Sequence, residues 1–199
     1  VTLNDTNALN FGASTVSGTL DVTAAGAITQ GGALAVTGTT TLTAGGANNI
    51  TLGNAANNFS TVTINSGNNV TLTDANAINL GASTVSGTLN VTASGTITDS
   101  GNLAVTGTTT LVAGAANDIT LDNANDFSTV VVTTGNNVTL NDVNALDLGA
   151  STVSGTLDIT ANGTIADSGN LAVTGTTTLA AGAANDITLN NANNFSTVV

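Results

Sequence analysis

The six residues Ala-Ser-Thr-Val-Ser-Gly at Ala82–Gly87 occur twice more in the chain, at Ala13–Gly18 and at Ala150–Gly155. Alignment outward from this stretch divides the chain into three tandem copies, whose starts lie 69 and 68 residues apart: 1–69, 70–137 and 138–199. Repetition at a fixed period is typical of solenoids, in which each unit packs only on its neighbours. We therefore expect one repeat domain over residues 1–199, and we expect it to be a segment of a longer array.

Within each copy, short runs alternate polar and apolar residues and are separated by Gly-rich or Asn-rich turns. One such run is Leu20-Asp21-Val22-Thr23, and another is Ile50-Thr51-Leu52. Alternation with a period of two predicts strands with one buried face, and we expect the alternating Thr, Asp and Asn residues to face water. No apolar stripe with the period of a helix persists. The residues predicted to point inward in the first copy and at the start of the second are Leu20, Val22, Ile28, Leu34, Val36, Leu42, Ile50, Leu52, Val62, Ile64, Val70, Leu72, Ile78 and Leu80.

The predicted strands are too short, and the connections between them too unlike hairpin turns, for strands to pair with their sequence neighbours. We expect coils that stack on the preceding coil through parallel pairing, about 4.8 Å apart. The fold class predicted is all-β, a right-handed parallel β-helix (β-solenoid), with about three coils in each repeat and about 23 residues in each coil.

The composition excludes most enzyme and nucleic-acid chemistry. The chain has no Lys, Arg, His, Cys, Met, Pro, Trp or Tyr, and its formal net charge is −12. It therefore lacks the usual general base and the cations that bind phosphate, nucleic acid or an anionic membrane surface. No apolar run approaches the roughly 18–20 residues of a membrane span. We expect no enzyme activity, no catalytic residue, no nucleic-acid partner and no membrane insertion.

Asp118, Asp122 and Asp126 surround one predicted turn and are the candidate metal ligands. Their carboxylates, with neighbouring asparagine amides, supply the hard oxygen atoms that suit Ca²⁺. The first and third copies do not keep this acidic set; their counterpart residues are Asn49, Gly53 and Asn58, and Asp186, Asn190 and Asn194. Solvated turn carboxylates are therefore the alternative interpretation, and calcium is the one cofactor that the sequence leaves open.

Two further positions are shared by all three copies. The first is acidic, and we expect its carboxylate to cap backbone N–H groups of a turn; it is occupied by Asp5, Asp74 and Asp142. The second is aromatic, and we expect it to fill the core or a corner of the coil; it is occupied by Phe59, Phe127 and Phe195. Asparagines in the turns are expected to hydrogen-bond to adjacent coils.

Several stretches resemble the repeats of filamentous-haemagglutinin-like, giant bacterial surface adhesins. They are Leu34–Gly45, Asn117–Leu121, Asp126–Val130 and Gly135–Leu140. The resemblance implies a right-handed parallel β-helix that forms the repeat shaft of an exported protein.

The function expected is structural: a rigid shaft or filament segment of an extracellular or cell-surface protein. One alternative is an ice- or calcium-binding solenoid, suggested by threonine runs such as Thr39-Thr40-Thr41. Another is a polysaccharide-processing β-helix enzyme. The partners expected are neighbouring coils of the same array or end-to-end copies in a homopolymeric fibre, and a receptor would be bound by regions outside this chain.

Overall fold

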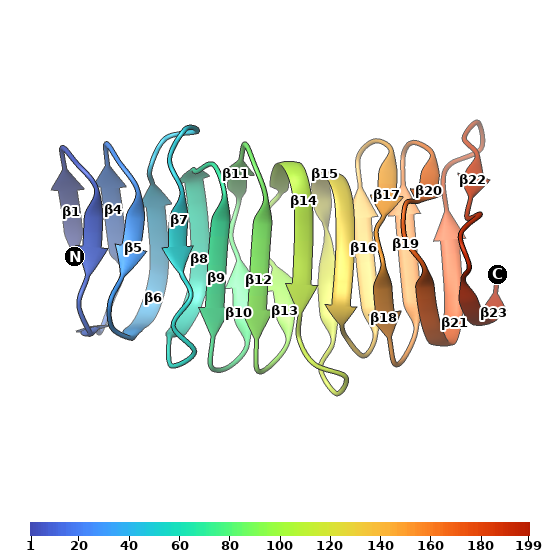
Figure 1. Ribbon diagram of the computed structural model, residues 1–199, viewed down its shortest axis with the longest axis horizontal. Helices are drawn as coiled ribbons and strands as arrows, with labels where there is room; N and C mark the ends of the chain where they lie inside the picture. The colour runs from blue at the N-terminus through green and yellow to red at the C-terminus, as the bar shows by residue number, and fades with distance from the viewer.

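The computed structural model describes all 199 residues and contains only strands, turns and bends. The chain winds into a rod with its N and C termini at opposite ends (Figure 1). Every strand pairing is parallel, as the pairings of β1, β9 and β16 with their neighbours illustrate. No helix is present that is long and apolar enough to cross a membrane. The all-β parallel solenoid predicted from the sequence is confirmed.

The structure has 23 strands, taken here by repeat. In the first repeat they are β1 (Thr2–Asp5), β2 (Leu9–Phe11), β3 (Ser14–Val16), β4 (Leu20–Ala24), β5 (Ile28–Gln30), β6 (Leu34–Thr43), β7 (Ile50–Leu52) and β8 (Asn58–Ser66). In the second they are β9 (Val70–Asp74), β10 (Ile78–Leu80), β11 (Ser83–Val85), β12 (Leu89–Ala93), β13 (Ile97–Asp99), β14 (Leu103–Val112) and β15 (Ile119–Thr134). In the third they are β16 (Val138–Asp142), β17 (Leu146–Leu148), β18 (Ser151–Val153), β19 (Leu157–Ala161), β20 (Ile165–Asp167), β21 (Leu171–Ala180), β22 (Ile187–Thr188) and β23 (Asn194–Val198).

Strand register gives the length of each coil. Thr2 pairs with Asp21, Asp21 with Thr41, and Thr41 with Thr63, so these coils take 19, 20 and 22 residues. The coils are therefore shorter than the 23 residues expected. The chain completes about ten of them, which gives a rod of about 48 Å at a strand spacing of about 4.8 Å.

Successive repeats begin on opposite faces of the rod. We call the sheet that contains β1 sheet A and the sheet that contains β2 sheet B. β9, the counterpart of β1, lies in sheet B, whereas β16 lies again in sheet A. Each repeat thus spans close to three and a half coils, slightly more than the three expected, because the coils are shorter than expected. Repeat boundaries therefore do not coincide with coil boundaries.

The protruding loops show the same half-turn alternation. The loops 44–49, 113–118 and 181–186 are equivalent, and each contains a glycine with positive φ: Gly45, Gly114 and Gly182. In Figure 1 the loop before β7 emerges at the upper edge, the loop between β14 and β15 at the lower edge, and the loop before β22 at the upper edge again.

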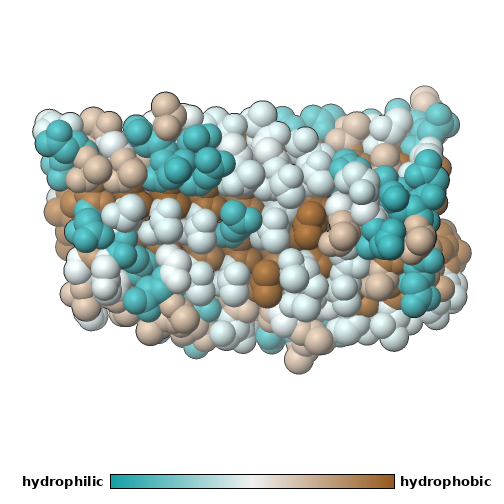
Figure 2. Space-filling view, viewed as in Figure 1, coloured by the Kyte–Doolittle hydropathy of each residue, from teal (hydrophilic) through white to brown (hydrophobic).

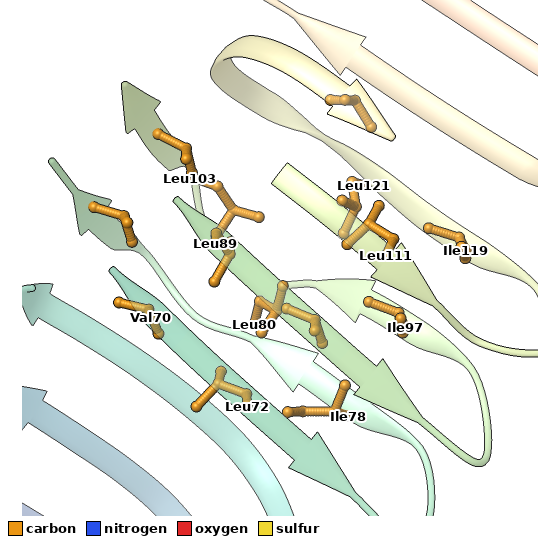
Figure 3. Close-up of a cluster of buried hydrophobic side chains, with 14 of the residues drawn as sticks. Val70, Leu72, Ile78, Leu80, Leu89, Ile97, Leu103, Leu111, Ile119 and Leu121 are labelled. Carbon is orange, nitrogen blue, oxygen red and sulfur yellow. The ribbon is translucent and has the colours of Figure 1, made fainter. Parts of the chain in front are cut away.

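One continuous apolar core runs along the rod. It contains 44 buried residues, from Phe11 to Ala181. Figure 3 shows side chains of β9, β12 and β14 pointing toward those of β10, β13 and β15. All the residues predicted to point inward are at most 2% exposed, and Phe59 and Phe127 are buried as expected. Phe195, the third residue of this set, is only partly buried and packs against the core. Burial of each large aliphatic side chain contributes about 1.5–3 kcal/mol.

Three inward-facing threonines interrupt this core. Thr40, Thr109 and Thr177 occupy one repeat position, are fully buried, and have hydroxyl groups with no hydrogen-bond partner. Thr109 pairs with Leu89 on one side and Val130 on the other, so its hydroxyl lies in an aliphatic column. The expectation that strand threonines face water is wrong at this position, because the middle residue of each Thr-Thr-Thr run falls on the inward phase of the strand.

Thr109→Val is expected to raise the free energy of unfolding by about 1–3 kcal/mol, since a buried hydroxyl without a partner costs about that much and valine has nearly the same shape. Urea unfolding monitored by circular dichroism measures the change. Thr110→Val, at the partly exposed neighbouring position, is the control and should change stability little. A destabilised Thr109→Val variant would show that the hydroxyl is hydrogen-bonded in solution.

Candidate functional site

The three calcium candidates do not converge on a common point. Asp118 lies just before β15, and its Oδ1 accepts hydrogen bonds from Asn136 Nδ2 at 2.9 Å and from the backbone N–H of Asn137 at 3.0 Å. Asp126 Oδ1 accepts a hydrogen bond from Asn144 Nδ2 at 2.8 Å. Nowhere in the chain do three or more acidic side chains gather closely enough to hold a metal ion. Asp118 and Asp126 instead bind asparagines of the following coil.

The acidic position shared by the three repeats connects adjacent coils. Asp74 is 1% exposed; its Oδ2 accepts a hydrogen bond from the N–H of Phe59 at 2.6 Å, and its Oδ1 accepts one from the N–H of Asn76 at 2.7 Å. Asp142 repeats both contacts with Phe127 and Asn144. Each carboxylate therefore caps its own turn, as predicted, and also anchors the preceding coil.

Asp5, the first member of this set, has no coil before it. It keeps only the local contact, in which its Oδ1 accepts a hydrogen bond from the N–H of Asn7 at 2.7 Å. Its side chain is half-buried rather than buried. The burial of Asp74 and Asp142 therefore comes from the stacking of coils and not from the turn itself.

Burial raises the pKa of Asp74 and Asp142 above the ordinary value of 3.8. The backbone hydrogen bonds lower the pKa of each carboxyl but do not offset the loss of solvation, and the charge of Asp126 raises that of Asp142 further. The chain has no basic side chain that could neutralise either carboxylate.

A second connection between adjacent coils, made by an asparagine side chain, also recurs in all three repeats. Asn125 is fully buried; its Oδ1 accepts a hydrogen bond from the N–H of Leu103, and its Nδ2 donates to the carbonyl of Leu121 and to Asp99 Oδ2. Asn57 and Asn193 accept the equivalent strand-opening N–H groups, those of Leu34 and Leu171. Each of these side chains thus links the first residue of a long strand to the turn, one coil later, that precedes the repeated phenylalanine.

The partner of this asparagine changes between repeats while its role is kept. Gln30, Asp99 and Asp167 occupy equivalent positions and bind the amide groups of Asn57, Asn125 and Asn193. Burial acts to raise the pKa of Asp167, but hydrogen bonds from Asn193, Asn190 and Asn191 outweigh it and hold that pKa below its ordinary value.

The sequence predicted inter-coil hydrogen bonds for the turn asparagines but did not single out this buried one. Its signal is its fixed place two residues before the repeated phenylalanine, in Asn57-Asn58-Phe59, Asn125-Asp126-Phe127 and Asn193-Asn194-Phe195. The neighbouring asparagine or aspartate in each copy is exposed. Because side chains of a strand alternate between its faces, the residue two before the phenylalanine shares its inward face, and the residue directly before it points to solvent.

The outward threonines do not form an unbroken rank. One outward column of sheet B runs through Asn10, Thr29, Thr51, Thr71, Asn90, Thr110 and Val131. Three consecutive threonines are followed by an asparagine and later by a valine. A flat threonine array repeated in every coil is therefore absent from this column.

The surface carries only shallow depressions. One of about 390 Å³ lies where β14 bends, between Val105, Phe127 and Ala145, with Asp126 at its rim. A depression of about 270 Å³ recurs at the equivalent place in the third repeat, beside Val173 and Phe195. They follow register shifts in the underlying strands.

Stability should fall as the pH rises from about 3.8 through the raised pKa of Asp74 and Asp142. Between the unfolded and folded pKa values the folded state binds more protons, so deprotonation favours unfolding. Below about 3.8 the lowered pKa of Asp167 acts in the opposite direction, and stability is lost as the pH falls. Urea titrations from about pH 3 to 7 measure the profile.

The control for this profile is the double variant Asp74→Asn, Asp142→Asn, in which the decline above about pH 3.8 should flatten. A wild-type stability that increases steadily from pH 4 to 7 would contradict the assignment.

Asn125→Ala is expected to lower the free energy of unfolding by about 1–3 kcal/mol for each buried group that it leaves unpaired, namely the N–H of Leu103 and the carbonyl of Leu121. The matched control is Asn123→Ala in the same turn, because that side chain makes no hydrogen bond. Equal losses in both variants would remove the special role given to Asn125.

Comparisons with known proteins identify the repeats. One family, described as "Repeats of unknown function (DUF5649)", matches three times, at residues 1–65, 67–134 and 135–199. These segments correspond to the three copies seen in the sequence, with boundaries displaced by a few residues. No curated protein and no solved structure shows significant similarity to the chain. The matched segments cover nearly the whole chain, which therefore belongs to the family of repeats of unknown function, DUF5649.

Proposed function

We propose that this chain is a rigid shaft segment of an extracellular fibre or bacterial surface adhesin, with a mechanical and not a catalytic role. The observation that carries the proposal is continuity across the repeat boundaries. β9 opens the second repeat and pairs with β7 before it and β12 after it; β16 does the same with β15 and β19. The core likewise runs through both boundaries. A rod without a hinge transmits force and orientation along its length.

Hydrogen bonding supports the same role. The chain makes 116 backbone–backbone hydrogen bonds, and the parallel ladders run along the rod axis. Aspartate and asparagine side chains add further links between coils at the turns, as Asp74 does to Phe59. Bending the rod would strain many of these contacts together, because each coil is held by its neighbours on both sides.

The surface suits a shaft that stays separate from its neighbours. In the space-filling view of Figure 2, hydrophilic and near-neutral side chains cover most of the visible face, and apolar atoms show in narrow bands between them. A net charge of −12 with no basic residue makes parallel rods repel one another. The absence of Lys and Arg also removes every site for trypsin-like proteases, which favours a location outside the cell.

The two carboxylates with a raised pKa accept hydrogen bonds from the backbone and connect adjacent coils. Asp74 and Asp142 lie on opposite sheets, and each is occupied by two backbone N–H groups. A glycoside hydrolase needs two carboxyl groups within about 5–9.5 Å of each other across a cleft. The shallow depressions offer no such pair, so the polysaccharide-processing alternative receives no support from the geometry.

Insertion of a second copy of residues 70–137 directly after Asn137 is expected to lengthen the rod by about 17 Å without widening it, since the added repeat supplies about three and a half coils at about 4.8 Å each. Small-angle X-ray scattering measures both dimensions.

On cells that produce the native protein, antibodies against the chain should label the intact surface.

A rod that bends at the inserted repeat, or labelling only after lysis, would contradict the proposal. The same samples distinguish the alternatives. A melting temperature raised by millimolar Ca²⁺ would indicate a calcium-binding module, and thermal hysteresis would indicate an ice-binding one.

A further inference from the structure

We infer that the junction of the second and third repeats carries a docking groove for a basic, extended segment of another protein. The segment presents Lys or Arg side chains to Asp126 and Asp147 and an apolar side chain to Val143. The inference goes beyond the proposed shaft role and does not depend on it.

Two neighbouring depressions form the groove. Their volumes are about 390 Å³ and about 220 Å³, and they share Ser128 and Ala145. The first begins at Ala104 on β14 and the second ends at Ala166 on β20. Strand pairing joins β14 to β20 through β15 and β17, so the groove crosses four successive coils along the rod axis. Four coils extend over about 14 Å, which is the length of about four extended residues.

Several differences between the otherwise similar repeats lie together at this groove. Four positions are occupied here by Asp126, Val143, Asp147 and Ala166, where the other copies have, in the same order, Asn58 and Asn194, Thr6 and Ala75, Asn10 and Asn79, and Thr29 and Thr98. Two of these changes add a negative charge, one adds an apolar side chain, and one removes bulk. They make this stretch of surface more acidic, more apolar and more open than its counterparts.

Each of the two carboxylates keeps one oxygen atom free. Asp126 Oδ1 accepts a hydrogen bond from Asn144 Nδ2, and Asp147 Oδ2 accepts hydrogen bonds from Thr129 Oγ1 and Ser168 Oγ. Neither Asp126 Oδ2 nor Asp147 Oδ1 accepts a hydrogen bond from the chain. The chain also has no Lys or Arg to pair with them. A cation at either carboxylate must therefore come from another molecule.

The junction of the first and second repeats shows what Ala166 changes. There Thr98 pairs with Asn79, and its Oγ1 donates a hydrogen bond to Asn79 Oδ1 at 3.2 Å. Ala166 pairs with Asp147 in the same way but has no hydroxyl group to donate. Both Ala166 and Asp147 line the groove. The acidic side chain is thus left open where its counterpart is covered.

Val143 gives the rim of the groove an exposed apolar side chain. It is 40% exposed, and the other large apolar side chains that are exposed to this extent lie in the first or last coil. Its N–H donates to the carbonyl of Asn125, which places it beside Asp126, and the next residue, Asn144, lines the groove. An apolar contact is therefore available next to the first carboxylate.

This combination of surfaces fits Lys and Arg side chains. Their aliphatic stems can cover alanine and valine while their charged ends reach the carboxylates, and Arg can bind a carboxylate through two parallel hydrogen bonds. Asp147 pairs with Thr129, three residues after Asp126, so the two carboxylates lie roughly 11 Å apart along the surface. Alternate residues of an extended peptide lie about 7 Å apart on one side, and two long side chains can span the difference.

The partner cannot be a second copy of this chain, because the chain has no Lys or Arg to present to the groove. The net charge of −12 attracts a basic partner from a distance and repels another copy. The occupant is therefore a different protein that carries basic residues at alternate positions with an apolar residue between them.

The test measures binding of the synthetic peptide Lys-Val-Lys-Val-Lys-Val to the full chain by isothermal titration calorimetry at low ionic strength. The double variant Asp126→Asn, Asp147→Asn should bind about tenfold more weakly, since it loses two ion pairs. The matched control is Asp21→Asn, Asp158→Asn, which removes the same charge from exposed positions outside the groove and should bind like the wild type. All four substitutions introduce the residue that another repeat carries at the same position, so both variants should fold.

A second pair of variants tests the shape of the groove without a change of charge. Ala166→Thr should weaken binding of the peptide, because it fills the groove and supplies the hydroxyl group that Thr98 gives to Asn79. Thr98→Ala, the converse change at the first junction, should leave binding unchanged.

Equal losses of affinity in the two double variants would show that the peptide responds only to the net charge of the rod, and would overturn docking at the groove. A peptide that does not bind would overturn it as well. Binding of a glucosamine oligomer in place of the peptide would assign the groove to a cationic glycan and overturn the protein partner. The shaft proposal is tested separately, by scattering from the chain with the inserted repeat.

Discussion

The requirement that each coil lie about 4.8 Å above the previous one governs the rest of the structure. At several points where successive coils meet, a Cβ does not fit. A Cβ on Gly107 would lie 2.6 Å from the carbonyl oxygen of Gly87, and the N–H of Gly107 donates to that same oxygen. A Cβ on Gly95 would lie 2.7 Å from the backbone nitrogen of Ala77. Glycine at these corners, facing backbone atoms of the preceding coil, follows from this spacing.

The second consequence of close stacking is that polar groups at the corners must find partners within the stack. Asp74 and Asn125 meet this need in different ways. Asp74 can accept two backbone N–H groups at once, whereas Asn125 accepts one N–H and donates to a carbonyl. Burial of the Asp74 carboxylate opposes ionisation, but its two hydrogen bonds connect one coil to the next. The cost of burying the charged carboxylate is thus partly offset by two hydrogen bonds that fix the backbone at this corner. At Thr109 a comparable polar group has no partner at all.

Period-two alternation predicted the strands and the inward residues, because a strand buried on one face leaves that pattern directly in the sequence. It could not predict the half-turn offset between repeats. That offset depends on which residues pair across coils, for example Thr41 with Thr63, and therefore on how many residues each corner consumes. The buried side of Asn125 was likewise hidden, since asparagine in a turn is ordinarily exposed and only its phase relative to Phe127 reveals it. The three acidic calcium candidates are close in sequence, but the hydrogen bonds of Asp118 and Asp126 to asparagines of the next coil could be seen only once the register was known.

The half-turn offset bears directly on the mechanics of the rod. If every repeat began on the same face, the loops around Gly45, Gly114 and Gly182 would all lie along one edge. A small bend of the rod at each loop would then have the same direction, and the bends would accumulate into a curved rod. With a half turn between repeats, the loops alternate between edges (Figure 1), so a bend introduced by one repeat is opposed by the next. Equivalent features recur on the same edge only every second repeat, about 34 Å apart. A straight rod can thus be extended by adding repeats of one sequence, since the bend introduced by each repeat is opposed by the next.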